Sequence, residues 1–189
     1  EMAKPGTRTL NMSSLGEALD PSLEPPVKAL YVYNSNPAAV APDQNEVLRG
    51  FAREDLFVAV HELFRTDTVD WADIVLPATT VLEHTDILKS YGHLHLAINR
   101  PAIAPLGECR SNTEVFRQLA SRMGLTDPRL FESDDALMEQ AFDWSHPNLE
   151  GVTFERLERE GSVRLNVPDP YAPFAEGGFP TPSGKCELL

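Results

Sequence analysis

Three short, uninterrupted apolar runs constrain the fold of this chain most strongly, because each leads into polar residues or a helix-like pattern. The runs are Ala29–Tyr33, Leu56–Val60 and Ile74–Leu76. A strand that is covered on both faces shows no polar alternation, and strands that alternate with helices form a parallel sheet. We therefore expect an α/β fold: three layers, a mostly parallel sheet with Rossmann-like βα units, and a helical C-terminal extension.

Helix signals accompany these runs. Asp43 followed by Glu46 marks a helix start, and Ser111 followed by Glu114 is a capping box ahead of an apolar face that ends at Gly124. The other predicted elements are a short helix at 69–72, a half-exposed strand within 91–103, and helices at 136–142 and 153–161.

The chain divides into three parts by composition. Residues 1–26 are polar with scattered glycine and proline, and we expect an irregular leading segment there. Residues 27–166 hold the alternating pattern and are expected to form one α/β domain. Residues 167–189 are rich in proline and glycine and are expected to be an extended connector toward a missing C-terminal domain.

Charge and hydrophobicity exclude several classes of protein. The net charge is −13 among 189 residues, and Lys and Arg form no cluster, which argues against a nucleic-acid partner. The longest apolar stretches are far shorter than the roughly 20 residues that span a bilayer, so no membrane span is expected. Cys109 and Cys186 form no disulfide framework, and a cytoplasmic location is the default expectation.

Candidate binding residues follow the predicted strands. Ligands of open parallel sheets bind beyond the carboxyl ends of the strands, which here lead into 34–37, 61–68 and 77–80. Asparagine before proline is also an ordinary turn former, and threonine before a helix an ordinary cap, so the local pattern leaves both interpretations open. The side chains with binding chemistry are the amides of Asn34 and Asn36, the carboxylate of Glu62, which can accept two donors from a base such as guanine, and the hydroxyls of Thr66 and Thr68.

Other motifs carry no assignment. His93 and His95 would share one face of a strand, but spacing fixes no third metal ligand, so we predict no metal site. The stretch Gly178–Lys185 mimics a phosphate loop with incorrect spacing and lacks its hydroxyl residue. We predict no catalytic residue in this chain.

A longer stretch resembles a known family. Leu63–Thr80, with Glu83 and Asp86 beyond it, is similar to the T-x-T-x-x-x-A-D-I-V-L-P-A-T-T-x-x-E segment of molybdopterin oxidoreductases, the dimethyl-sulfoxide-reductase superfamily that includes formate dehydrogenases and nitrate and polysulfide reductases. Weaker similarities, in the order of the family, are Asn34–Pro37, Pro105–Glu108, Leu119–Gly124 and Thr181–Lys185.

The resemblance implies the third, α/β domain of such an enzyme, which helps to hold one guanine dinucleotide arm of the bis-molybdopterin cofactor of molybdenum or tungsten. Asn34, Asn36 and Pro37 would shape one wall of the site. Glu62 and Thr66 would bind the guanine edge, and Thr68 would support the loop. An iron-sulfur cluster and the metal ligand would belong to earlier domains.

The resulting functional prediction is a cofactor-binding domain of a molybdopterin-dependent oxidoreductase, inactive in isolation. Its expected partners are the other domains of its parent polypeptide and an electron-transfer subunit. The alternative is a non-catalytic α/β module for protein interaction or nucleotide binding. A hydrolase on the same sheet is disfavoured, because the chain has no G-x-S-x-G nucleophile motif.

Overall fold

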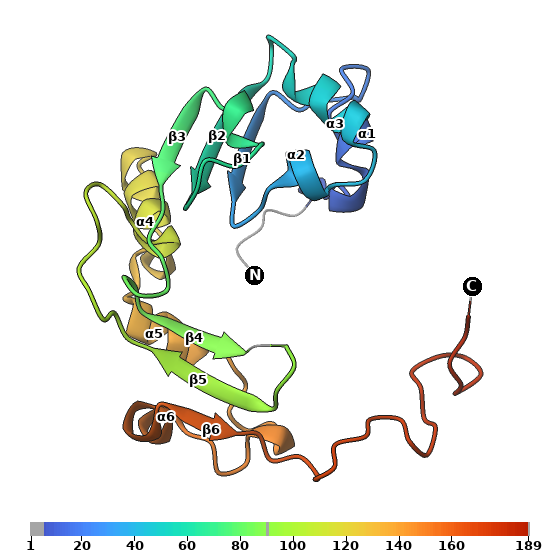
Figure 1. Cartoon of the computed structure of the whole chain (residues 1–189), viewed down its shortest axis with the longest axis vertical. Coiled ribbons are helices and arrows are strands. Elements are labelled where there is room, and N and C mark those ends of the chain that lie inside the picture. The colour runs from blue at the N-terminus through green and yellow to red at the C-terminus, as the bar shows by residue number, and fades with distance from the viewer. Residues whose placement is uncertain (1–5, 90, 189) are drawn as a thin grey trace. The chain divides into compact units, whose positions relative to one another are not determined.

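The structure is a computed structural model that describes residues 6–89 and 91–188. The described residues form two compact units, the first from 6–84 and 100–132 and the second from 85–99 and 133–188 (Figure 1). The single domain expected over 27–166 therefore contributes to both units.

The first unit is built on a parallel sheet in the order β1-β2-β3. These strands are β1 (Ala29–Tyr33), β2 (Phe57–Glu62) and β3 (Ile74–Pro77). Val32 lies opposite Val60, and Val60 opposite Val75, so the three carboxyl ends meet at one edge. The predicted parallel arrangement is confirmed, and each strand lies within two residues of its predicted run.

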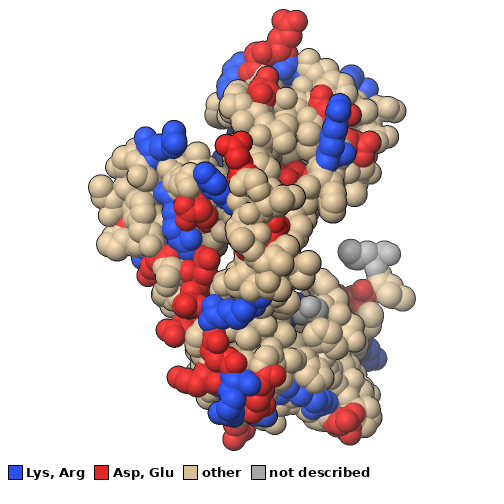
Figure 2. Space-filling view, turned by 60° about the vertical axis from the view of Figure 1, so that its left-hand side comes forward, with Lys and Arg blue, Asp and Glu red and all other residues tan. Residues whose placement is uncertain are grey.

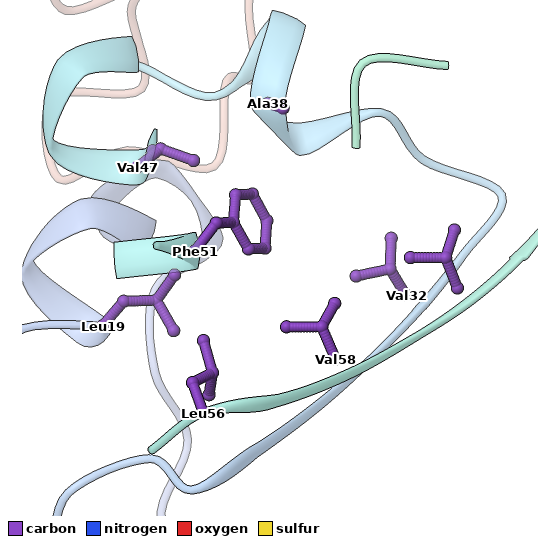
Figure 3. Packing of buried hydrophobic residues seen from close by; sticks show 8 residues of the cluster. Leu19, Val32, Ala38, Val47, Phe51, Leu56 and Val58 are labelled. Carbon is purple, nitrogen blue, oxygen red and sulfur yellow. The ribbon is translucent and has the colours of Figure 1, made fainter. Parts of the chain in front are cut away.

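Three helices cover one face of this sheet: α1 (Leu15–Ala18), α2 (Pro37–Val40) and α3 (Gln44–Phe51). Asp43 caps α3 by accepting a hydrogen bond from Glu46 N at 3.2 Å, as its spacing predicted. The side chains between the helices and the sheet point toward one another (Figure 3). They are Leu19, Val32, Ala38, Val47, Phe51, Leu56, Val58 and Val60, and full burial of each larger one is worth roughly 1.5–3 kcal/mol.

The segment before β1 is more ordered than its composition predicted. A 3-10 turn, η1 (Met12–Ser14), leads into α1, which packs against α3. Gly50 of α3 lies so close to α1 that an added Cβ would come within 2.5 Å of Leu19 Cβ. The absence of a side chain at Gly50 thus allows α1 and α3 to approach closely, and helix propensity alone does not predict this contact.

The other face of the sheet packs against α4 (Asn112–Arg122), which Ser111 caps by accepting from Glu114 N at 3.3 Å. The Phe116 ring lies 5.6 Å from Tyr31 and 5.3 Å from Tyr33, centroid to centroid. Because these tyrosines alternate with the buried Val32, α4 lies opposite α1–α3, and the predicted three-layer arrangement is present in this unit. The unit also contains η2 (Val69–Trp71) and η3 (Pro128–Phe131).

The second unit has an antiparallel sheet, in addition to the helices that the sequence predicted for this region. Its strands are β4 (Asp86–Lys89), β5 (His95–Asn99) and β6 (Ser162–Arg164), in the order β4-β5-β6. Its helices are α5 (Asp134–Gln140), α6 (Phe154–Glu160) and the short η4 (Pro147–Leu149). The core residues are Leu96, Leu149, Val152, Leu157 and Val163.

Residues 167–188 contain no helix or strand in the part of the chain that the structure describes. Two local contacts order this stretch. Phe174 stacks on Phe179 at 4.6 Å, and Thr181 Oγ1 donates to Lys185 O at 2.7 Å. A connector toward a further domain stays a prediction for this stretch.

Candidate functional site

The carboxyl ends of β1, β2 and β3 bring together the three loops that the sequence singled out. We call the loops 34–37, 62–68 and 77–80 the crest. Tyr33 is paired with His61, so Asn34 and Glu62 follow neighbouring strands at the same level, and Glu62 is paired with Pro77. All six predicted site residues lie in the first two loops.

Asn34 turns the chain out of β1 with a left-handed backbone, at φ 53°. Asparagine tolerates this conformation better than most other non-glycine residues, so Asn34 fits this position with little strain. Its exposed side chain accepts a hydrogen bond at Oδ1 from Asn112 Nδ2, at 3.1 Å. Since Oδ1 is used in this way, the Asn34 NH₂ group remains to face a ligand.

Asn36 and Thr68 join the first two loops to each other. Asn36 Oδ1 accepts from Thr68 N at 3.1 Å and from Thr68 Oγ1 at 2.7 Å, and its Nδ2 donates to Asp67 at 3.2 Å. Thr68 Oγ1 in turn accepts from Ala38 N, at 3.0 Å, next to the buried Pro37 at the start of α2. The Asn36 carbonyl oxygen is thus committed within the protein, so Asn36 shapes the site through its backbone and its NH₂ group.

Glu62 ends β2 as a half-buried carboxylate. Its Oε1 accepts from Leu63 N at 2.7 Å, and among the described residues Oε2 accepts no hydrogen bond. A carboxylate whose second oxygen accepts no hydrogen bond is suited to bind a ligand that presents hydrogen-bond donors.

Thr66 holds a crest hydroxyl that is buried without a hydrogen-bond partner among the described residues. Its Oγ1 is enclosed and has no partner in the described part of the chain. Buried polar groups nearly always have a partner, and each exception calls for an explanation. A bound group that meets this hydroxyl after a small loop movement would provide one.

The third loop is fixed by Glu83. Its buried carboxylate accepts from Thr80 N at 2.8 Å and from Leu106 N at 2.7 Å. These hydrogen bonds, first that from Thr80 N, hold the pKa of Glu83 below its usual value of 4.5. Thr79 Oγ1 also lies 2.9 Å from His84 Nδ1. Sequence reasoning assigned no role to Glu83, because its contact with the stretch Pro105–Glu108 depends on tertiary structure.

Sequence reasoning also missed His61 and Asn112. His61 is fully buried, and its Nε2 donates to Arg110 O at 3.1 Å, because a carbonyl can only accept. His61 Nδ1 is then a bare acceptor, and no described residue pairs with it. Asn112 lies 78 positions from Asn34 and meets it only through the packing of α4 on the sheet. The capping box locates the start of that helix but not its neighbour.

The histidines considered as metal ligands do not form part of a metal-binding group in the described residues. No group of three His, Cys, Asp or Glu residues suitable for a metal ion occurs within 6–89 and 91–188. The rings of His93 and His95 lie 5.8 Å apart, centroid to centroid, and His93 Nδ1 accepts from His95 N. The two cysteines are free thiols, and no helix of the described residues is long and apolar enough to cross a membrane.

Comparison with known proteins identifies the family. The sequence profile of molybdopterin oxidoreductases matches residues 11–122, which include the whole sheet of the first unit and the crest. The chain belongs to the molybdopterin oxidoreductase family. The resemblance carried by Leu63–Thr80 is therefore confirmed, as is the α/β fold class.

Individual members of the molybdopterin oxidoreductase family extend the match to almost the whole chain. The probable oxidoreductase YoaE of Bacillus subtilis (strain 168) is 45% identical over 182 residues, which are 96% of this chain and 26% of the relative. The probable oxidoreductase YyaE of the same organism is 32% identical over 187 residues, 98% of this chain and 27% of the relative. The chain thus spans about a quarter of the length of the curated relatives it matches.

A solved structure supports the fold independently. The acetylene hydratase from Pelobacter acetylenicus superposes with a TM-score of 0.60 at 26% identity, covering 94% of this chain and 24% of that chain. One similar protein is thus named a hydratase and two are named probable oxidoreductases. Membership of the family alone does not specify the reaction.

Proposed function

We propose that this chain is a cofactor-binding domain of a longer molybdopterin oxidoreductase, and that its crest holds a guanine dinucleotide arm of the molybdenum or tungsten cofactor. The proposal rests on two groups of the crest that have no hydrogen-bond partner among the described residues. One is the second carboxylate oxygen of Glu62, and the other is the enclosed hydroxyl of Thr66. Both belong to groups that the family resemblance assigns to the guanine edge.

The donors and acceptors of the crest fit guanine better than adenine. Guanine presents two parallel donors, N1–H and its amino group, beside the O6 acceptor. A carboxylate at Glu62 accepts both donors, and the NH₂ group of Asn34, left over from its bond to Asn112, donates toward O6. Adenine offers an amino donor where guanine has O6, so the Asn34 NH₂ group would face another donor.

The remaining predicted residues, Asn36, Pro37 and Thr68, hold the binding loops in place and are not proposed to contact the base. Asn36 and Thr68 hold the loops after β1 and β2 together, and Pro37 begins α2 against Thr68. The bonds within this pair hold the loop that carries Thr66 against the loop that carries Asn34. Preorganisation of this kind lowers the cost of binding, because the loops are ordered before the ligand arrives.

The cofactor, when bound, would supply the metal centre at which the parent enzyme transfers electrons together with oxygen or hydrogen. The chain's own residues would bind and orient the nucleotide arm, and since we assign no catalytic residue to them, the domain by itself is expected to be inactive. We place the metal ligand and an iron-sulfur cluster in domains before residue 1, and a further domain after the connector 167–189. A cytoplasmic parent that passes electrons to a partner subunit completes the proposal.

The test removes the charge of Glu62 in the full-length protein. Glu62→Gln keeps the size of the side chain but exchanges a charged acceptor for a neutral amide. Hydrogen bonds to charged groups contribute about 1.5–3 kcal/mol, so retention of the cofactor should weaken by roughly 10- to 100-fold. Molybdenum or tungsten content and released guanine, each per polypeptide after purification, measure the effect.

Glu54→Gln is the matched control, because Glu54 is an exposed carboxylate at the opposite end of β2. It removes the same charge from the same unit and should leave metal and guanine contents unchanged. Equal contents in wild type and Glu62→Gln would reject the assignment of the guanine edge. Thr66→Val is a second arm, and it should lower both contents without weakening the fold.

A further inference from the structure

The outer edge of β3 is an unprotected strand edge. β3 is the last strand of the parallel sheet, and Ile74 and Val75 are 47% and 49% exposed. Natural proteins usually protect such edges with charged residues, bulges or a covering segment, because an open edge pairs with other strands. The residues 74–76 are all uncharged and apolar. Arg110 N donates to Pro77 O at 3.1 Å and so closes only the far end of the edge.

A groove of about 350 Å³ runs between this edge and α4. Its apolar lining comes from both sides, and its polar groups come from α4 and the segment just before it. The lining residues are Val75, Leu76, Pro77, Val115 and Leu119, with Glu108, Arg110, Gln118 and Arg122. An extended chain placed there would meet apolar side chains on one side and open backbone groups of β3 on the other.

The two arginines of the groove have no acidic partner. Neither Arg110 nor Arg122 forms an ion pair with any described residue, and the Arg110 guanidinium meets only Glu108 O, at 3.5 Å. Gln118 is already used, since its Nε2 donates to Glu114 at 2.7 Å. In a chain of net charge −13, most arginines have acidic neighbours, as Arg53 and Arg129 do.

A favourable interaction with the helix dipole accounts for one of these arginines only. Arg122 lies in the last turn of α4, where a cation is stabilised, but Arg110 precedes the helix. In Figure 2 the left-hand side of Figure 1 comes forward, and basic and acidic side chains are interspersed there with uncharged surface. The groove therefore offers an apolar floor, an open strand edge and two unpaired cations, against the single carboxylate of Glu108.

We propose that this groove receives an extended segment from the part of the same polypeptide that lies outside residues 1–189. The segment adds to β3 as a further strand and sets a carboxylate against Arg110 and Arg122. The proposal rests on the chain being one part of a longer protein, and not on its binding a cofactor. It is supported by the relatives, which are about four times as long, and by the tendency of natural proteins to pair or cover an open strand edge.

Hydrogen exchange followed by mass spectrometry tests this proposal on two proteins, the 189-residue chain and the full-length protein. Peptides that cover Ile74–Leu76 should exchange about tenfold or more slowly in the full-length protein, because strand addition pairs the outward backbone groups. The full-length protein is measured both with and without its cofactor. Protection is expected in both forms, and this separates the groove from the crest.

Charge variants test the contact to the arginines. Arg122→Glu in the full-length protein should restore fast exchange of the β3 peptide. Ser121→Glu is the control, because it introduces the same carboxylate in the same last turn of α4 but outside the groove lining and leaves Arg122 in place, so it should leave the protection intact.

Three results would overturn the proposal. One is equal exchange of the β3 peptide in the 189-residue chain and the full-length protein. Another is protection that appears only when a separate subunit or the cofactor is added. The third is an equal response to Arg122→Glu and Ser121→Glu, which would remove the carboxylate contact.

Discussion

Replacing Thr68 by valine should weaken the first unit strongly, although valine has almost the same shape. The Thr68 hydroxyl donates to Asn36 Oδ1 at 2.7 Å and accepts from Ala38 N at 3.0 Å, and both Thr68 and Ala38 are fully buried. Asn36 Oδ1 keeps its bond from Thr68 N, but Ala38 N loses its acceptor. An unsatisfied buried donor costs about 1–3 kcal/mol and a lost net hydrogen bond about 1 kcal/mol, so we expect a destabilisation of about 2–4 kcal/mol.

Urea unfolding measures this change. Trp71 lies in η2, directly after Thr68, and a Trp144→Phe background removes the only other tryptophan, so that the fluorescence reports the first unit. With a urea dependence of about 2 kcal/mol per molar, the middle of the usual range, the midpoint should fall by about 1–2 M.

Thr66→Val is the comparison that makes the reasoning refutable. The Thr66 hydroxyl is enclosed and has no partner, so Thr66→Val should not lower the free energy of unfolding and should raise it if the unsatisfied hydroxyl costs stability, because no hydrogen bond is lost. The account of the crest fails if the two valine variants are equally destabilised, or if Thr68→Val unfolds at the same urea concentration as the unaltered Thr68 protein.

Three further changes probe the packing, the third loop and the second unit. Gly50→Ala should lower the free energy of unfolding by about 1–2 kcal/mol in the same urea assay, because overpacking against Leu19 outweighs the gain in helix propensity. Glu83→Gln should lower the thermal midpoint at pH 7 but flatten its pH dependence between pH 5 and 3. The folded pKa of Glu83 is depressed, so its stabilisation is present above 4.5 and is lost as pH falls through the folded pKa. Leu157→Ala should cost about 2–5 kcal/mol in the second unit, measured by Trp144 fluorescence in a Trp71→Phe background.

Each of these changes has an outcome that would count against its reasoning. If Gly50→Ala has the same free energy of unfolding as the exposed-site variant Asn45→Ala, then α1 moves to accommodate the added methyl group without cost. For Glu83, an unaltered pH profile would show that its carboxylate does not contribute to folding. A free energy of unfolding of Leu157→Ala within about 0.5 kcal/mol of the wild-type value would show that Leu157 does not stabilise the core of the second unit.

The parallel sheet could be predicted because its strands carry their own signal. Strands that are buried on both faces read as continuous apolar runs, and these runs coincide closely with β1, β2 and β3. α4 was predictable for a similar reason, since Ser111 and Glu114 form a capping box that acts within one turn. These local signals, together with parallel pairing, are enough to bring Asn34 and Glu62 to one edge.

The elements that were missed depend on contacts between distant residues. α1 has only four residues, and it is stabilised by packing against α3 at Gly50, which lies more than 30 positions along the chain. β4 and β6 have four and three residues and form only by pairing with β5. No periodicity in such short segments distinguishes a strand from a loop.

The same limit applies to the crest. The sequence identified its polar residues, but it could not separate those that bond to one another, such as Asn36 and Thr68, from those with bonding capacity left over, such as Glu62 and Thr66. That distinction depends on the packing of two loops against each other. It also decides which of the predicted residues can meet a ligand.

The central claim is that the crest holds a guanine nucleotide, and a structure of the full-length protein with its cofactor bound tests it most directly. The account predicts that N1 and the amino nitrogen of one guanine lie within about 3.2 Å of the Glu62 carboxylate, with Thr66 Oγ1 in hydrogen-bond contact. If every guanine is bound elsewhere, and the loops at 34–37 and 62–68 contact no part of the cofactor, the proposed function is wrong.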